Sequence, residues 1–171
     1  MDILSRFSQI TTFVFDVDGV LTDGSLIIMP GTEYVRTMNV KDGFALQLAV
    51  KKGYRIIIIS GAKSVAVEAR MNYLGIKEVF MGVKDKRTFL QEKLKPGDQE
   101  HVLFMGDDLP DLELLQQVFL PACPADAAPE ILSIAQYISP FAGGKGCVRD
   151  VVEKVMKLRN DWSNEERVVS M

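Results

Sequence analysis

Three short, almost uninterrupted apolar runs constrain the fold of this chain most strongly. They cover Thr12 to Val17, Ile56 to Ile59 and Val102 to Met105. Because apolar residues follow one another without alternation, both faces of each strand are expected to be buried, as in a parallel sheet covered by helices. Helical patterns separate the runs. The sequence therefore predicts a three-layer α/β/α, Rossmann-like sandwich around a parallel central sheet.

Apolar residues spaced at i, i+3 and i+4 predict helices over residues 43–52, 64–74, 85–94, 109–118 and 148–159. The chain has 171 residues, 47% of them hydrophobic and 25% charged, which is ordinary usage for one globular domain. We expect a single domain over residues 1–171, ending in a polar and charged tail at 160–171.

Two carboxylates at spacing i, i+2, Asp16 and Asp18, follow the first apolar run, and Gly19 comes directly after them. Ligands of open α/β folds bind beyond the carboxyl ends of the strands, so both acids are expected to face a binding site. Two partly desolvated carboxylates repel each other unless a cation lies between them or one of them takes a proton. The simplest such cation is Mg²⁺, which prefers oxygen ligands. The alternative is that each Asp only caps a turn.

Polar residues follow the other two strands as well. Ser60 and Gly61 offer a hydroxyl and backbone N–H groups suited to phosphate oxygens. A third cluster follows Met105 and contains Asp107, Asp108 and Asp111. Between these strands, Lys84 and Lys86 compete for the role of a cation at a helix start. The carboxyl ends of parallel strands meet at one edge, so these groups are expected to converge there.

This ordered set resembles the haloacid dehalogenase-like (HAD) phosphatase superfamily, whose motifs supply DxD, Ser/Thr, Lys and an acidic cluster in that order. Further segments resemble its small, capless branch that contains 3-deoxy-D-manno-octulosonate (KDO) 8-phosphate phosphatase. They are Lys41-Asp42-Gly43, Arg70 to Ile76 and Gly143 to Gly146 with Arg149. The resemblance covers nearly the whole chain.

The resemblance implies a phosphoric monoester hydrolase that works through an aspartyl-phosphate. Asp16 would be the nucleophile and Asp18 the general acid and base. Ser60, the Gly61 N–H and Lys86 would hold the phosphoryl oxygens, and the family spacing favours Lys86 over Lys84. Mg²⁺ would be held by Asp16, the backbone carbonyl of Asp18 and Asp107, with Asp108 and Asp111 orienting ligands or waters.

The resemblance also implies a sugar-acid phosphate as substrate, most specifically KDO 8-phosphate. Candidate substrate-binding residues besides Gly61 are Asp23, Arg70, Gly144, Lys145 and Arg149. One departure concerns Ala62, where many octulosonate phosphatases carry an arginine. The alternative substrate is a nine-carbon nonulosonate 9-phosphate, such as a sialic acid phosphate.

Residues 24–39 break the alternation of strands and helices. They contain Pro30-Gly31 between apolar segments, which predicts a small β-hairpin flap at the site edge, in place of a cap domain. Its apolar side chains favour packing on another subunit over packing within one monomer. The resemblance implies a homotetramer assembled through these hairpins.

The remaining composition narrows the class of protein. A net charge of −3 argues against a nucleic-acid surface, and no apolar run is long enough for a membrane span. Cys123 and Cys147 lack CxxC spacing and are expected to be buried and reduced, which favours the cytoplasm. Residues 7–15 are too polar for the apolar core of a signal peptide. His101 is expected at the surface, without a catalytic role.

Three other functions use part of the same residue set. A phospho-receiver module would place the phosphorylated aspartate at a later strand end than the acidic pair, but the strand ending at Ser60 supplies no Asp. A non-catalytic assembly module would not need the full set of polar residues. A mutase is disfavoured by the absence of a cap domain.

Overall fold

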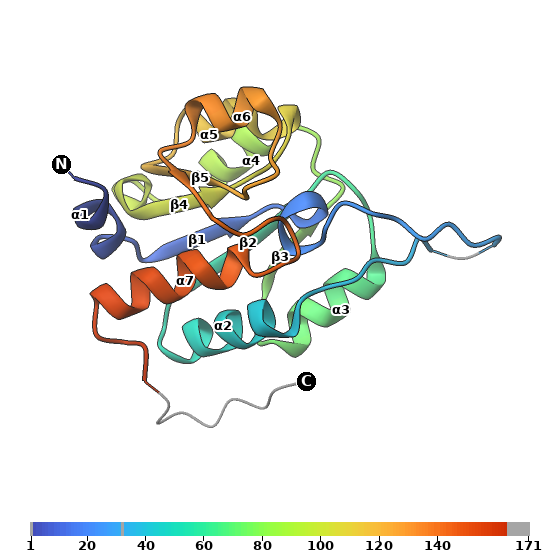
Figure 1. Cartoon of the computed structure of the whole chain (residues 1–171), viewed down its shortest axis with the longest axis horizontal. Helices are drawn as coiled ribbons and strands as arrows, with labels where there is room; N and C mark the ends of the chain where they lie inside the picture. Colours follow the sequence, from blue (N-terminus) through green and yellow to red (C-terminus); the bar gives the residue numbers. More distant parts are fainter. Residues whose placement is uncertain (1, 32, 164–171) are drawn as a thin grey trace.

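The computed structural model describes residues 2–31 and 33–163, and its centre is a six-stranded sheet whose paired neighbours all run parallel. The strand order is β3-β2-β1-β4-β5-β6 (Figure 1). The strands are β1 (Thr12–Phe15), β2 (Arg55–Ser60), β3 (Glu78–Met81), β4 (Val102–Met105), β5 (Leu120–Cys123) and β6 (Tyr137–Ile138). This arrangement confirms the predicted parallel α/β architecture.

Helices cover both faces of the sheet (Figure 1). One face carries α1 (Ile3–Ser8), α2 (Val40–Lys51), α3 (Val65–Tyr73) and α7 (Cys147–Leu158). The other carries α4 (Lys86–Lys93), α5 (Leu112–Leu115) and α6 (Pro129–Ile134). Three layers result, as predicted. In the described part of the chain, no helix combines the length and apolar character that crossing a bilayer requires.

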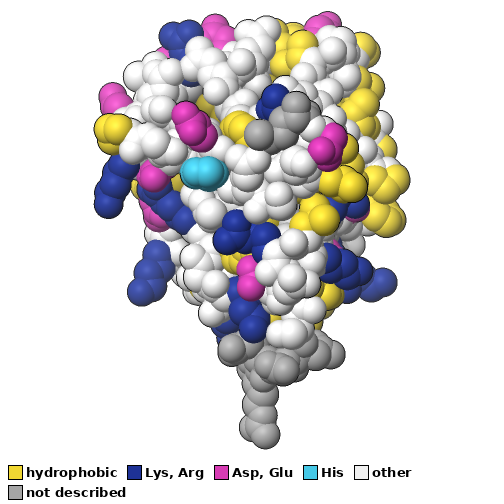
Figure 2. Space-filling view, turned by 90° about the vertical axis from the view of Figure 1, so that its left-hand side faces the viewer, with side chains coloured by type: hydrophobic (Ala, Val, Ile, Leu, Met, Phe, Trp, Pro, Cys, Tyr) yellow, Lys and Arg dark blue, Asp and Glu magenta, His cyan; other side chains and the backbone are white. Residues whose placement is uncertain are grey.

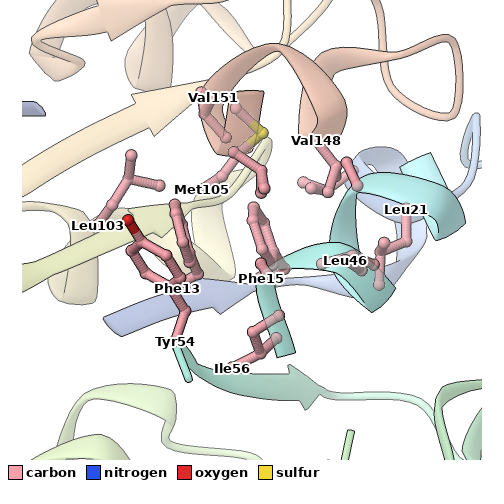
Figure 3. Packing of buried hydrophobic residues seen from close by; sticks show 14 of the residues in the cluster. Phe13, Phe15, Leu21, Leu46, Tyr54, Ile56, Leu103, Met105, Val148 and Val151 are labelled. Atoms are coloured by element: carbon pink, nitrogen blue, oxygen red, sulfur yellow. The ribbon is translucent and has the colours of Figure 1, made fainter. Parts of the chain in front are cut away.

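Strand β1 is buried on both faces and lies in the middle of the molecule. Phe13 and Phe15 point toward α7 and α2, with their rings stacked 6.0 Å apart (Figure 3), while Val14 packs into the opposite layer. Each of these side chains is fully buried. Burial of one such side chain contributes roughly 1.5–3 kcal/mol to folding. The residue that follows Phe15 is therefore held on a rigid support.

Several helix boundaries differ from the prediction. Helix α2 begins at Val40 rather than residue 43, because the Asn39 side chain accepts a hydrogen bond from the Lys41 N–H (2.8 Å) and caps it. The single helix expected over 109–118 is wrong. A 3₁₀ turn at Leu109–Asp111 precedes a short α5, and Pro110 lies in that turn, where its missing N–H costs little.

Residues 24–31 and 33–39 belong to an extended arm that leaves the body of the molecule and returns (Figure 1). Ile27 and Val35 pair as a single antiparallel bridge, with two N–H···O=C bonds of 3.1 Å. The chain reverses as the predicted hairpin would, but among the described residues the antiparallel pairing is limited to this one bridge and is shorter than the two strands expected. An isolated two-stranded ribbon is marginal in water, which explains the short pairing.

The predicted tail at 160–171 falls partly outside the described residues, because 164–171 are not described. Within the described part, Trp162 packs edge-on against Phe44, with ring centroids 6.2 Å apart. Asp161 accepts a hydrogen bond of 2.6 Å from the Tyr54 hydroxyl. The first residues after α7 therefore fold back onto the α2 layer.

Candidate active site

A cleft of about 500 Å³ lies at the carboxyl ends of β1, β2 and β4. Its lining contains most of the predicted catalytic and metal-binding residues: Asp16, Asp18, Ser60, Gly61, Lys84, Lys86, Asp107, Asp108 and Asp111. The only histidine, His101, precedes β4 at the opposite edge of the sheet, where Figure 2 shows it among side chains of both charges. The polar strand ends thus meet where parallel topology places them.

Asp16 continues directly from β1 and is 8% exposed. Its Oδ1 accepts a hydrogen bond of 2.7 Å from the Val17 N–H, at the start of a tight turn over Val17–Leu21. Gly19 in this turn has a φ of +88°, and a Cβ there would lie 1.9 Å from Oδ2 of Asp107. Only glycine lets the turn approach the second acidic cluster so closely.

Lys86 is the first residue of α4 and points into the cleft. Asp85 caps this helix by accepting from the Thr88 N–H (3.0 Å). The Lys86 Nζ lies 2.8 Å from Oδ1 of Asp16 and 2.6 Å from Oδ1 of Asp111, and its side chain is 4% exposed. Lys84, its rival in the sequence, lines the same cleft but is exposed to solvent.

One carboxylate oxygen from each of Asp16, Asp107 and Asp111 falls within 4.8 Å of the others, a spacing suited to a metal ion. Both oxygens of Asp111 are engaged, one by Lys86 and one by the Asp107 N–H (3.0 Å). Oδ1 of Asp107 is buried and has no hydrogen-bond partner among the described residues. Asp16 and Asp107 therefore have free capacity for a cation, whereas Asp111 orients its neighbours.

Burial and mutual repulsion raise the pKa values of these acids. Burial, followed by the nearby Asp111, raises the pKa of Asp16 to about 7. Burial, followed by the nearby Asp16, raises the pKa of Asp107 to about 7. Three carboxylates against the Lys86 ammonium leave two negative charges, which one divalent cation balances. The donor set therefore fits a hard divalent ion such as Mg²⁺.

Asp18 also lines the cleft and is paired with Arg36 of the arm. Nε of Arg36 donates to Oδ1 (2.7 Å) and Nη2 donates to Oδ2 (3.2 Å). The sequence prediction did not include Arg36. Its partner lies 18 residues away, and the only available signal was a cation inside an arm expected to border the site.

The end of β2 supplies the predicted phosphate-binding groups. Ser60 is 1% exposed, and its Oγ accepts from the Ala62 N–H (3.2 Å). Gly61 follows it on the cleft wall. Asp108 is exposed at the rim, where it accepts a bond of 2.8 Å from the Leu109 N–H and caps the 3₁₀ turn. These groups surround an open space beside Asp16 and Lys86.

Among the predicted substrate-binding residues, Asp23, Gly144 and Lys145 lie outside this cleft. Lys145 is 3.6 Å from Asp23 in an ion pair at the surface. Gly144 donates its N–H to the Val20 carbonyl (2.9 Å), so its backbone packs behind the turn that follows Asp16.

Arg149 and Arg70 are also placed away from the cleft. Arg149 pairs with Glu153 (2.9 Å) and lies beside the Phe44 ring, on the rim of a larger hollow of about 820 Å³ over α1 and α7. Arg70 lies over the Tyr73 ring and lines a crevice of about 260 Å³ beneath the arm. A role for either arginine in substrate binding remains a prediction.

The chain is similar to curated and structurally characterised proteins over almost its whole length. No protein-family model matches it. It is 33% identical to the KDO 8-phosphate phosphatase KdsC of Yersinia pestis, over 91% of this chain and 84% of that protein. The corresponding values for KdsC of Escherichia coli K12 are 34%, 91% and 84%.

Structural similarity is equally extensive. The KDO 8-phosphate phosphatase of Moraxella catarrhalis, solved with a magnesium ion, phosphate and KDO, superposes with a TM-score of 0.87 at 30% identity. The match covers 94% of this chain and 93% of that one. The resemblance inferred from the motifs is thereby confirmed, and the chain belongs to the KDO 8-phosphate phosphatase family of HAD-like phosphatases.

Proposed function

We propose that this protein is a Mg²⁺-dependent phosphatase that hydrolyses KDO 8-phosphate to KDO and inorganic phosphate. The observation that carries the proposal is the arrangement around Asp16: a buried carboxylate 2.8 Å from the Lys86 ammonium, beside an Asp107 oxygen without a partner in the described part of the chain. Relatives that carry the KDO 8-phosphate phosphatase name support the choice of substrate.

In the first step, an oxygen of Asp16 attacks phosphorus while the bond from phosphorus to the sugar oxygen breaks. Asp18 gives its proton to the departing oxygen. Ser60 Oγ, the Gly61 N–H and the Lys86 ammonium hold the phosphoryl oxygens, because these donors surround the open space beside Asp16.

In the second step, Asp18 accepts a proton from water as that water attacks the aspartyl-phosphate. The bond between Asp16 and phosphorus breaks, which releases inorganic phosphate and restores the carboxylate. Asp18 thus ends the cycle with the proton that it lost in the first step. The pair of displacements replaces one difficult hydrolysis.

The Mg²⁺ would be held by the carboxylates of Asp16 and Asp107 and by the backbone carbonyl of Asp18. Asp111 and Asp108 would orient these ligands. Bound Mg²⁺ neutralises charge between the anionic nucleophile and the anionic phosphate. Asp111 suits the orienting role because Lys86 and the Asp107 N–H already occupy its two oxygens.

We also infer that the arm assembles copies of this chain, as a homotetramer. Its side chains Leu26, Ile27, Ile28, Met29, Tyr34 and Val35 are 40–74% exposed, an unusual apolar surface for a free monomer. Asp23, Arg70, Lys145 and Arg149 would then act on the sugar acid at a neighbour's cleft. Gly144 would not contribute its N–H, because that group already bonds to the Val20 carbonyl. Replacement of Ile28 by Lys is expected to reduce the sedimentation mass, whereas a wild-type mass would argue against assembly through the arm.

The test of activity is phosphate release from KDO 8-phosphate, a nonulosonate 9-phosphate and hexose phosphates, each with Mg²⁺ or EDTA. We expect a strong preference for KDO 8-phosphate, consistent with a cytoplasmic role in lipopolysaccharide sugar synthesis. Preference for the nine-carbon acid would instead assign a change of specificity to Ala62. If none of the substrates releases phosphate in a metal-dependent way, the proposed phosphatase function is refuted.

A further inference from the structure

Arg36 is the most deeply inserted charged side chain of the arm. Its neighbour Val35 is 42% exposed, but the Arg36 side chain is only 6% exposed because it reaches back from the arm to the body of the molecule. Its Nη1 also donates to the Tyr34 carbonyl (3.2 Å). The guanidinium is thus held both by the backbone of the arm and by Asp18.

The contact between Arg36 and Asp18 is bidentate and therefore directional. Two parallel N–H···O bonds fix the plane of a carboxylate, which a single contact does not. The bonds are unequal, 2.7 Å to Oδ1 and 3.2 Å to Oδ2. Asp18 also lines the cleft and is 33% exposed. The carboxyl group is therefore fixed in orientation and still accessible to a ligand in the cleft.

We infer that Arg36 is a positioning residue for the reaction, which fixes the Asp18 carboxyl group where it exchanges a proton with the leaving-group oxygen. This inference rests on the proposed phosphatase function. As the bond from phosphorus to the leaving-group oxygen breaks, the proton passes from Asp18 to that oxygen. Arg36 keeps its own protons and transfers none.

A second explanation is that Arg36 only ties the arm to the body. The two roles differ in how they depend on the leaving group. An alkyl phosphate such as KDO 8-phosphate expels an alkoxide, which needs the proton from Asp18. 4-Nitrophenyl phosphate expels a stable phenolate, which departs without one. A positioning role therefore affects the alkyl substrate selectively, and a mere tether does not.

The experiment compares kcat/KM for KDO 8-phosphate and for 4-nitrophenyl phosphate at saturating Mg²⁺ in Arg36→Gln and Arg36→Lys. General acid catalysis contributes about 10²–10⁴-fold, and losing only the orientation of the acid is expected to remove about 10–100-fold of it. We expect Arg36→Gln to lose that factor on KDO 8-phosphate and less than about threefold on 4-nitrophenyl phosphate. Arg36→Lys keeps one charged donor, and is expected to fall between wild type and Arg36→Gln.

Two further variants bound the measurement. Asp18→Asn removes the proton donor itself and sets the largest selective loss that Arg36→Gln can reach. Arg55→Gln is the matched control, because Arg55 makes an equally bidentate pair with Glu78 (2.8 Å and 2.8 Å), at the start of β2 and away from the cleft. It is expected to leave the ratio of the two substrates unchanged.

Equal losses on both substrates in Arg36→Gln, or no loss on either, would overturn the inference. If Arg36→Gln does not fold, the same ratio in Arg36→Lys decides. If the wild-type protein hydrolyses at least one of the substrates with Mg²⁺, the phosphatase function is supported regardless of the results for the Arg36 variants. Wild-type protein inactive on both would refute that function, and the positioning role with it.

Discussion

Replacing Lys86 with Met is expected to destabilise the metal-free protein strongly. The Lys86 ammonium lies 2.8 Å from Asp16 and 2.6 Å from Asp111, and the three side chains are between 1% and 11% exposed. Methionine fills a similar volume but carries no charge. The substitution therefore leaves two buried carboxylates without their shared counter-ion.

The expected loss in the free energy of unfolding follows from the burial of these three side chains. Removing one partner of a buried ion pair costs about 3–5 kcal/mol. For a chain of this size each kcal/mol corresponds to about 2–4 °C in melting temperature, so a decrease of about 6–20 °C is expected. The loss has a defined pH dependence. Burial and Asp111 already raise the pKa of Asp16 to about 7, against a usual 3.8, and Lys86 lowers it.

Without Lys86, the pKa of Asp16 rises further. A carboxyl group whose pKa is raised by folding stabilises the fold while it is protonated, and this contribution is lost as the pH rises through the folded pKa. The free energy of unfolding of Lys86→Met is therefore expected to fall further below that of the wild type at pH 8 than at pH 6. Mg²⁺ is expected to restore part of the stability at pH 8, because it supplies the missing positive charge.

The assay is urea unfolding in EDTA at both pH values, with Lys84→Met as the matched control. Lys84 lies two residues earlier and lines the same cleft, but it is exposed to solvent. Its replacement is expected to cost less than about 1 kcal/mol, as for most surface changes. A loss below about 1 kcal/mol in Lys86→Met at pH 8, or equal losses in the two variants, would refute the reasoning.

Three further predictions concern the acidic cluster. Asp16→Asn is expected to abolish phosphate release and the phosphoenzyme detected by mass spectrometry, while the circular dichroism spectrum stays unchanged. Residual turnover above about 1% would exclude Asp16 as the nucleophile. Gly19→Ala is expected to weaken Mg²⁺ binding about 10–100-fold by calorimetry, because its Cβ displaces Asp107, and wild-type affinity would contradict this. The pKa values of Asp16 and Asp107, both about 7, predict that Mg²⁺ binding releases protons below pH 7. Mg²⁺ is therefore expected to raise the melting temperature more at pH 8 than at pH 6, and equal increases would rule out this linkage.

The sequence was sufficient to predict the sheet and the convergence of its polar ends. Continuous apolar runs indicate buried parallel strands, and the carboxyl ends of such strands share one edge by topology alone. Asp16, Ser60 and Asp107 could therefore be expected together without knowledge of any contact. The structure places all three on one cleft, as this reasoning requires.

Contacts that depend on tertiary approach could not be predicted. The pairing of Arg36 with Asp18 depends on where an irregular arm returns to the body, and no periodicity encodes that path. The division of the 109–118 segment depends on Pro110 and on the short distance left before β5 begins at Leu120. Helix periodicity describes which face is apolar, but it does not determine where the chain must turn.

The glycine-rich segment at 143–146 illustrates the same limit. From the sequence it resembled a substrate-binding loop, but a Cβ at Gly143 would lie 1.9 Å from the carbonyl oxygen of Gly19. Gly144 donates to the Val20 carbonyl at 2.9 Å, and the Cys147 thiol approaches the same oxygen at 3.3 Å. Residues 143–146 therefore pack against the turn that carries Asp18. This close packing is one reason why the segment contains glycine. Any contribution to a neighbour's cleft would have to come from side chains that this packing leaves exposed, of which Lys145, at 62% exposure, is one.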